Sequence, residues 1–431
     1  MIQTDQDKKV RGRIKIPGSK SISHRAAIAA ALAEGKSRLK GFLRCEDTFY
    51  TVQALTQLGA EFSFREDTLE VNGCGTNLNG LSSRRELYLG NSGTSLRLLV
   101  GVSALVCGDI VLTGSPRMQQ RPIGDLVTAL RKLGVQIDYL GMEGCPPVVV
   151  RTKGIKGGRI RVDASKSSQF ISSLLLSAPL AERDVELEVI GTPVSRPYID
   201  ITLDVMRRFG VSVEHDGYRY FKIPPGQKYR SQDLIVEGDV SSASYFWAAA
   251  AVTKTQIITE NIYPHITRQG DIRFLNILRE MGCETEIYKD RVMVRGGDLT
   301  SINADMASMP DMVPTLAAVS LFAKGKTIIR NVSHLRHKES DRLNAIAQGW
   351  GRLGARIEQR EDGLVIHGGY PLKPAEVDSH NDHRIAMGLA VISLKLRGLH
   401  IKDRSCVSTV SYTHLRAHET SLHLVCRLLL E

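Results

Sequence analysis

Apolar and polar positions in this chain follow a pattern that recurs about every seventy-five residues. In each copy an amphipathic stretch ends in glycine, alternating residues follow, and a short apolar run comes next. The glycines are spaced by 75, 76, 72 and 72 residues and stand at Gly59, Gly134, Gly210, Gly282 and Gly354. Glycine is common just after a helix ends, and alternation is typical of a half-buried strand. The pattern therefore predicts a repeated helix–strand–strand unit.

The short apolar runs predict the returning strand of these units. They are Leu69–Val71, Val148–Val150, Val292–Val294 and Leu364–Ile366. At this period the 431 residues accommodate six α/β units. Six such units favour two lobes of three with an active site between them. An open solenoid is less favoured, because the other helices expected here are too apolar for an exposed array.

Those other helices share a polar first turn and an apolar body. They are expected in residues 17–32, 91–106, 165–181, 239–252, 310–323 and 381–394. A helix that is apolar all round is buried along its length. Its first turn offers unpaired N–H groups and the positive end of the helix dipole, which favour phosphate or carboxylate. Each polar turn alone is consistent with simple capping, but six of them together indicate a shared anion site.

Composition narrows the ligand class. The chain carries a net charge of +11, and 42% of its residues are hydrophobic, as in an ordinary globular protein. The basic residues are spread along the chain with no Lys/Arg block, so small anions are better candidate ligands than nucleic acid. The seven cysteines form no CxxC pair, which favours reduced thiols in a cytoplasmic protein. No signal peptide and no membrane-spanning run is recognised.

Nine short motifs give this sequence a family resemblance. They are PGSKSISHR, LGNSGTSLR, PRMQQRPIGDL, SKSSQF, SRPYIDIT, EGDVSSASYF, MPDMVPTLA, RHKESDRL and NDHRIAM. In this order they resemble the enolpyruvyl transferases, in particular the branch that acts on shikimate 3-phosphate. The resemblance implies an α/β fold, a two-lobed inverse α/β barrel with three βαβαββ repeats and buried parallel helices in each lobe. It also implies that residues 18–237 form one lobe and residues 1–17 with 238–431 the other.

The resemblance further implies the reaction. The enolpyruvyl group of phosphoenolpyruvate passes to the 5-hydroxyl of shikimate 3-phosphate, and phosphate leaves. This chemistry needs a base for the hydroxyl, an acid for the methylene carbon, and fixed positive charge around two anions. No cofactor and no metal is expected. The expected partners are these two small molecules, with no nucleic acid and no membrane, and the protein is expected to be a cytoplasmic monomer.

The motifs also imply roles for individual residues. Contacts to shikimate 3-phosphate are assigned to Lys20, Ser21, Arg25, Ser167, Ser168, Gln169, Ser195, Tyr198, Asp311 and Lys338. Contacts to phosphoenolpyruvate are assigned to Lys20, Asn91, Gly93, Thr94, Arg121, Gln169, Arg342, His383 and Arg384.

Three residues are the expected catalytic groups. Asp311 is the expected hydroxyl base, and its apolar sequence neighbours predict a raised carboxyl pKa. Glu339 is the second expected proton-transfer group, and Lys20 is the third catalytic residue. Without the resemblance, Asp311 would be read as a helix cap and the KESDR run around Glu339 as a solvated charged segment.

The sequence departs from the family pattern at three places. Leu98 follows Arg97 where several relatives carry Pro, and only a slight change of the Gly93 loop is expected. His334 stands where some relatives carry Asn, which is expected to weaken one polar contact to shikimate 3-phosphate. After Cys406, Thr409 stands where the family carries Lys, and the following Phe-Pro is absent. We therefore expect residues from about 408 onward to be frameshifted or vector-derived, with weaker binding of phosphoenolpyruvate and a less stable second lobe.

Three alternatives stay open at the level of sequence. A UDP-N-acetylglucosamine enolpyruvyl transferase has the same fold, but that branch has Lys-Asn where this chain has Lys20-Ser21, and a loop Cys that is missing from residues 117–121. A catalytically impaired anion-binding relative would fit Thr409. A nucleic-acid-binding module would fit only the basic balance.

Overall fold

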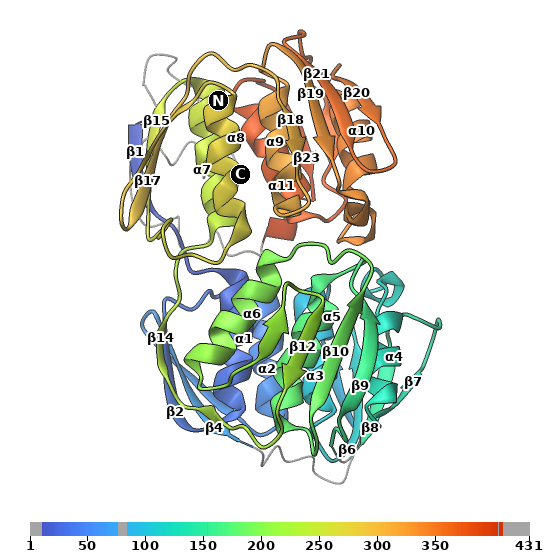
Figure 1. The fold of residues 1–431 in the computed structure, drawn as a ribbon. Coiled ribbons are helices and arrows are strands. Elements are labelled where there is room, and N and C mark those ends of the chain that lie inside the picture. Colours follow the sequence, from blue (N-terminus) through green and yellow to red (C-terminus); the bar gives the residue numbers. More distant parts are fainter. Residues whose placement is uncertain (1–10, 76–83, 153, 404, 408–431) are drawn as a thin grey trace. The chain divides into compact units, whose positions relative to one another are not determined.

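The computed structural model describes residues 11–75, 84–152, 154–403 and 405–407. The chain forms two compact units (Figure 1). The central unit is Gly18–Val236, and the terminal unit combines Met1–Pro17 with Glu237–Glu431. No helix among the described residues is long and apolar enough to cross a membrane.

Five sheets share one strand order, which makes the repeat visible. In each, two neighbouring strands are parallel, and two antiparallel strands continue the sheet. The strands of the central unit are β2 (Ala33–Lys40), β3 (Glu61–Arg65), β4 (Thr68–Cys74), β5 (Arg85–Tyr88), β6 (Gly108–Thr113), β7 (Gln136–Tyr139), β8 (Val148–Thr152), β9 (Gly158–Asp163), β10 (Val185–Ile190), β11 (Glu214–Asp216), β12 (Tyr220–Ile223), β13 (Tyr229–Arg230) and β14 (Asp233–Ile235).

The terminal unit follows the same plan in two of its sheets, β1-β15-β17-β16 and β18-β19-β21-β20. A third sheet contains β22 and β23 among the described residues. The strands are β1 (Arg11–Lys15), β15 (Gln256–Glu260), β16 (Glu284–Ile287), β17 (Arg291–Arg295), β18 (Asn303–Asp305), β19 (Gly325–Arg330), β20 (Arg356–Gln359), β21 (Leu364–Gly368), β22 (Glu376–Asp378) and β23 (His400–Lys402).

One sheet in each unit joins strands that are far apart in the sequence. β1 lies parallel to β15, with Arg11 opposite Gln256, so the N-terminal strand belongs to the terminal unit. β14 lies parallel to β2, with Asp233 opposite Arg38, so the strand before residue 237 completes a sheet of the central unit. β13 also lies parallel to β2, so two strands from the end of the central segment pair with this early strand.

The helices are of two kinds. Buried helices with polar first turns are α1 (Lys20–Ala31), α3 (Gly93–Ser103), α5 (Ser168–Ser177), α7 (Val240–Thr253), α9 (Val313–Ser320) and α11 (His383–Ser393). More amphipathic helices that carry their own exposed faces are α2 (Glu46–Gln57), α4 (Gly124–Lys132), α6 (Pro197–Arg208), α8 (Phe274–Glu280) and α10 (Arg342–Gly351). In the terminal unit, α7, α9 and α11 pack against one another and are surrounded by the sheets (Figure 1).

The sequence pattern predicted these elements correctly. All five repeat glycines follow a helix and have positive φ, from 82° at Gly210 to 111° at Gly59. The four apolar runs lie in β4, β8, β17 and β21. The expected buried helices are also present, although residues 310–323 begin with a 3₁₀ turn, η4 (Pro310–Met312), before α9 starts.

Candidate active site

The predicted site residues fall into one group in each unit. In the central unit, Lys20 opens α1 and donates to the Asp47 carboxylate at 2.9 Å. Both side chains are only 12–13% exposed, so this ion pair is poorly screened by water. Asp47 lies in the first turn of α2, and its own carbonyl accepts a hydrogen bond from Ser95 at 3.0 Å. Asp47 therefore joins the first turns of three helices.

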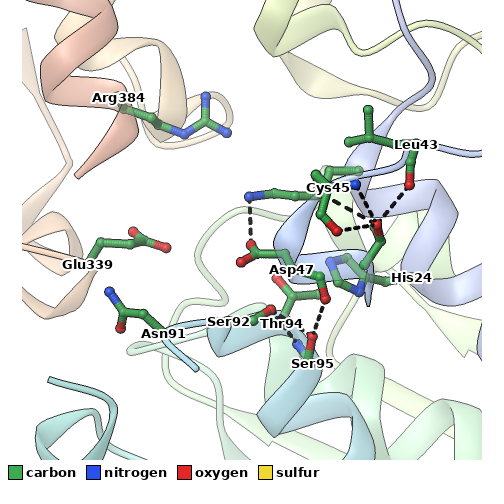
Figure 2. Close-up of polar contacts among 12 residues, drawn as sticks. His24, Leu43, Cys45, Asp47, Asn91, Ser92, Thr94, Ser95, Glu339 and Arg384 are labelled. Carbon is green, nitrogen blue, oxygen red and sulfur yellow. Dashed lines mark hydrogen bonds and ion pairs between the residues drawn. The ribbon is translucent and has the colours of Figure 1, made fainter. Parts of the chain in front are cut away.

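A chain of buried hydroxyls extends this connection, and Figure 2 shows its last members, Ser95 beside Asp47 and Ser92. His24 Nδ1 lies 2.7 Å from Thr51 Oγ1, which lies 2.8 Å from Ser95 Oγ. Ser95 in turn lies 2.7 Å from Ser92, the N-cap of α3. Burial holds the pKa of His24 well below its usual value, with the Lys20 charge adding to this effect. The imidazole is therefore neutral. The series of hydrogen-bonded hydroxyls fixes the start of α3 relative to α1.

Arg25 is a buried cation held by neutral oxygens. It is 1% exposed, and it donates to Thr202 Oγ1 at 2.7 Å, to the Ser21 carbonyl at 2.9 Å and to Ser172 Oγ at 3.2 Å. Burial lowers its pKa to about 10, while the nearby Tyr198 opposes this shift. Arg25 thus stays charged at neutral pH. No carboxylate among the described residues forms an ion pair with it.

The loop before α3 lies against Arg121. Arg121 is 3% exposed and donates to the Asn91 carbonyl at 3.0 Å. Gly93 lies over the same guanidinium, because a Cβ at this position would be 2.5 Å from Arg121 Cζ. The Asn91 side-chain oxygen is buried and accepts no hydrogen bond within the described residues.

The start of α5 reaches the same loop. Gln169 donates to Thr94 Oγ1 at 3.0 Å and accepts from Arg97 at 2.8 Å. Ser167 caps α5 by accepting from the Gln169 amide at 3.2 Å. Gln169 therefore fixes the first turns of α3 and α5 against each other, and the neighbouring Ser168 is 3% exposed.

Ser195 and Tyr198 lie at the start of α6. Ser195 has a φ of 54°, a left-handed conformation that is rare for serine and is often found at functional sites. It is 3% exposed, and its hydroxyl has no hydrogen-bond partner in the described part of the chain. The Tyr198 amide donates to the Ser195 carbonyl at 3.1 Å.

In the terminal unit, Arg342 is surrounded by carboxylates. It is 1% exposed and donates to Asp382 at 2.9 Å, to Asp311 at 2.9 Å and to Glu339 at 2.7 Å. These three charges together raise the pKa of Arg342 above its usual value, although its burial opposes them. An anionic substrate that binds Arg342 must therefore compete with at least one of these carboxylates.

Asp311 bridges two arginines. Its second oxygen accepts from Arg384 at 3.0 Å, while the first holds Arg342. The sequence neighbours of Asp311 are apolar, and they gave no indication of these two guanidinium groups, which favour the charged carboxylate. Arg384 and His383 open α11, where Asp382 is the N-cap and accepts from the Arg384 amide at 2.9 Å.

The last predicted residues of this group lie near η5 (Ser333–His337). Lys338 directly follows that turn, is half-buried and precedes Glu339. His334 is 5% exposed, and burial lowers its pKa to about 3, with the Lys338 charge as a further cause. It is therefore a neutral side chain. Its Nε2 has no hydrogen-bond partner in the described ranges.

Several contributing residues were missed at the level of sequence. Asp47 holds Lys20, Arg97 holds Gln169, and Asp382 holds Arg342. Arg97 and Asp382 lie inside the motifs LGNSGTSLR and NDHRIAM, so their position was a usable signal. Asp47 had none, because it is 27 residues away from Lys20 along the chain.

Two further expectations concerned the C-terminal tail and the absence of a metal site. Thr409 and the expected aberrant tail lie outside the described residues. Among the residues that the structure describes, no group of three His, Cys, Asp or Glu side chains is placed to hold a metal ion.

Comparisons with known proteins identify the family. The family model described as EPSP synthase (3-phosphoshikimate 1-carboxyvinyltransferase) matches residues 4–417. The 3-phosphoshikimate 1-carboxyvinyltransferase of Sulfurovum sp. is 42% identical, over 95% of this chain and 96% of its own length. The enzyme of that name from Vibrio vulnificus is 44% identical, over 93% and 94%.

A solved structure agrees with this assignment. The EPSP synthase of Acinetobacter baumannii superposes with a TM-score of 0.79 at 29% identity, covering 97% of this chain and 96% of its own. The expected two-lobed inverse α/β fold is thereby confirmed, and the UDP-N-acetylglucosamine branch is not favoured. From its motifs, its repeats and these relatives, the chain belongs to the EPSP synthase family, the 3-phosphoshikimate 1-carboxyvinyltransferases.

Proposed function

We propose that this protein transfers the enolpyruvyl group of phosphoenolpyruvate to the 5-hydroxyl of shikimate 3-phosphate and releases phosphate. The observation that carries this proposal is Arg25, a fully buried cation held by three neutral oxygens. Burying an unpaired charge is costly, and a bound phosphate would remove that cost. A phosphorylated sugar acid supplies such a group.

The central unit is proposed to bind the substrates. Lys20, Ser21, Arg25, Ser167, Ser168, Gln169, Ser195 and Tyr198 are assigned to shikimate 3-phosphate, and Asn91, Gly93, Thr94 and Arg121 to phosphoenolpyruvate. The buried oxygens of Ser195 and Asn91, which find no partner among the described residues, support this assignment. A buried polar atom without a partner costs about 1–3 kcal/mol unless a ligand supplies one.

The terminal unit is proposed to transfer protons. Asp311 accepts the proton of the 5-hydroxyl as its oxygen adds to C2 of phosphoenolpyruvate, and Glu339 protonates the methylene carbon. The resulting tetrahedral intermediate loses that proton again and expels phosphate, which restores the vinyl ether. Lys20, Arg342 and Arg384 stabilise the negative charge of the substrates and of the leaving phosphate. Lys338 and His383 are assigned to shikimate 3-phosphate and phosphoenolpyruvate respectively.

The ion pairs in this unit support a switch on binding. Asp311 is held by Arg342 and Arg384. If the anions of phosphoenolpyruvate engage the same guanidinium groups, the ion pairs of Asp311 weaken and its carboxylate becomes more basic. The base would then be activated only when the second substrate is present.

Release of inorganic phosphate from phosphoenolpyruvate, with and without shikimate 3-phosphate, tests the proposal on the full chain. Release that depends on shikimate 3-phosphate is expected, and glyphosate, the inhibitor of this family, is expected to suppress it. Turnover with UDP-N-acetylglucosamine instead would favour the rival branch. Absence of release with either acceptor would contradict the proposal and favour an impaired relative.

The remaining expectations on partners and location are part of the proposal. We propose a monomer that acts in the cytoplasm on small molecules and binds no nucleic acid. The net charge of +11 then attracts small acidic substrates rather than a polyanion. Light scattering of the purified chain tests the monomer, and DNA binding with a steep salt dependence would contradict the last point.

A further inference from the structure

Tyr245 presents a buried hydroxyl that the reaction described above does not use. It lies on α7 and is 2% exposed, and its hydroxyl has the Arg384 guanidinium as a neighbour without a hydrogen bond of full geometry among the described residues. Buried tyrosine hydroxyls usually find a partner, and leaving one without a partner costs about 1–3 kcal/mol. The position of this hydroxyl therefore needs an explanation other than core packing.

The surroundings of Tyr245 are the proton-transfer groups of the terminal unit. α7 packs against α9, α11 and the η4 turn, and these elements carry Asp311 and Arg384. The charges that act on the phenol are those of Arg384, Arg342 and Asp311. Burial raises the pKa of Tyr245 to about 12, although the two arginines oppose this shift. The phenol is therefore neutral at physiological pH.

A neutral phenol beside a guanidinium can serve as its hydrogen-bond acceptor. Its oxygen accepts an N–H of the arginine without taking away the positive charge. In this structure Arg384 donates to the Asp311 carboxylate at 3.0 Å. An arginine that turns from a carboxylate toward an anionic substrate loses a strong partner, and a neutral acceptor beside it limits the freedom of its side chain.

We propose that Tyr245 is a positioning residue for Arg384, and that its hydroxyl oxygen accepts an N–H of this guanidinium while Arg384 binds the anionic groups of phosphoenolpyruvate. The inference rests on the proposed function, which assigns Arg384 to that substrate. It predicts that loss of the hydroxyl weakens phosphoenolpyruvate binding and leaves shikimate 3-phosphate binding unchanged.

Tyr229 supplies a matched control within the same chain. It is also buried, at 2% exposure, but its hydroxyl donates to the Leu176 carbonyl at 2.8 Å inside the central unit. Its hydrogen bond ties a residue of β13 to Leu176 near the end of α5, two helical turns after the predicted site residues in the first turn of that helix. Removing either hydroxyl deletes one buried oxygen. Comparing the two variants therefore distinguishes a positioning role of Tyr245 from a general loss of stability.

The test compares Y245F with Y229F in the full chain by phosphate release and thermal unfolding. Y245F is expected to raise KM for phosphoenolpyruvate at least fivefold, with KM for shikimate 3-phosphate within twofold of wild type. Y229F is expected to lower Tm and leave both KM values within twofold. A Y245F enzyme whose KM for phosphoenolpyruvate stays within twofold overturns the inference. Wild type without turnover would instead contradict the proposed function.

A second measurement does not depend on turnover or on the stability of Y245F. 3-Fluorotyrosine placed only at position 245 gives one fluorine resonance, which reports directly on the hydroxyl. Adding phosphoenolpyruvate together with shikimate 3-phosphate is expected to shift that resonance, whereas shikimate 3-phosphate alone is expected to leave it nearly unchanged. A resonance that both additions leave in place contradicts the inference.

Discussion

The guanidinium of Arg121 occupies the space into which a side chain at Gly93 would project. A Cβ at Gly93 would lie 2.5 Å from Arg121 Cζ and 2.7 Å from Nη1, which is closer than real contacts allow. The motifs assign both Gly93 and Arg121 to phosphoenolpyruvate, and the structure brings the two residues together. The glycine thus sets the position of an arginine that is already held by the Asn91 carbonyl.

Replacing Gly93 with alanine is expected to displace Arg121 and weaken phosphoenolpyruvate binding. Because the displaced group is the end of a side chain rather than backbone, the protein should still fold. We expect KM for phosphoenolpyruvate to rise about tenfold, the effect of losing roughly 1.4 kcal/mol of binding. Steady-state kinetics with each substrate varied in turn measures this change.

Gly351 provides the control for that substitution. It lies at the end of α10, and a Cβ there meets no atom within 4 Å. G351A should leave both KM values unchanged and slightly raise Tm, since alanine favours the helix by about 1 kcal/mol over glycine. Equal kinetics for G93A and wild type would mean that Arg121 moves aside at no cost to binding.

The ion pair between Lys20 and Asp47 leads to a second prediction. D47N keeps the shape of the side chain but removes the charge that holds the Lys20 ammonium at 2.9 Å. We expect kcat/KM for phosphoenolpyruvate to fall between about tenfold and a hundredfold, as misplacement of a catalytic group does. E46Q changes the neighbouring carboxylate, which accepts from the exposed Tyr50 hydroxyl, and should remain within twofold of wild type.

The contact between Gly93 and Arg121 was easier to predict from the sequence than the ion pair between Lys20 and Asp47. The repeat glycines and the apolar runs predicted the five full sheets, because helix ends and strand alternation are local properties. Gly93 and Arg121 each lie in a motif assigned to phosphoenolpyruvate, whereas Asp47 lies in none of the nine motifs. The pairing of β1 with β15 was expected only from the family resemblance, since strand partners 245 residues apart leave no local signal.

The side-chain partners were the least predictable part of the site. The surroundings of Asp311 looked apolar along the chain, yet Arg342 and Arg384 come from 31 and 73 residues away. Asp47 and Tyr245 went unrecognised for the same reason, because an acid or a tyrosine on a helix is ordinary until its neighbours are known. Sequence patterns therefore supplied candidate anion-binding residues but not the side chains that hold the cations in place.

Asp382 gives a prediction about stability. Its carboxylate is fully buried and accepts from Arg342 at 2.9 Å, from Ser340 at 3.0 Å and from the Arg384 amide. D382N removes one of the three negative charges that surround the buried Arg342 guanidinium. We expect the free energy of unfolding to fall by about 3 kcal/mol, the usual cost of breaking a buried ion pair.

Chemical denaturation with urea measures that loss, and a surface ion pair supplies the comparison. Glu376 pairs with Lys402 at 2.8 Å, but both side chains are more than half exposed. E376Q should therefore change the free energy of unfolding by less than about 1 kcal/mol. If D382N and E376Q had equal effects, Arg342 would not depend on the Asp382 charge.

Asp271 gives a prediction about pH. It lies in the η3 turn (Gly270–Arg273), is 5% exposed and accepts a short hydrogen bond from Ser241. Burial raises its pKa to about 7, and the charge of Asp311 adds to the rise, while Arg384 and Ser241 oppose it. Asp239 is a further acidic neighbour that raises the pKa. In the unfolded chain the carboxyl group of an aspartate has a pKa of about 3.9.

The sign of the effect on stability follows from these two values. Between about pH 4 and pH 7 the folded protein holds a proton on Asp271 that the unfolded chain releases, so the folded state loses stability as the pH rises through this window. Above pH 7 the folded protein carries a buried carboxylate. D271N removes this titration, because an amide stays neutral throughout.

We therefore expect D271N to unfold at a higher temperature than wild type at pH 8, with the difference shrinking toward pH 5. D298N is the matched control: Asp298 is exposed and pairs with Lys254, and that pairing lowers its pKa. This variant should show no gain in Tm at pH 8. A gap between D271N and wild type that stays constant from pH 5 to pH 8 would mean that Asp271 does not titrate in this range. The proton assigned to Asp271 would then reside on another buried acid near Asp311.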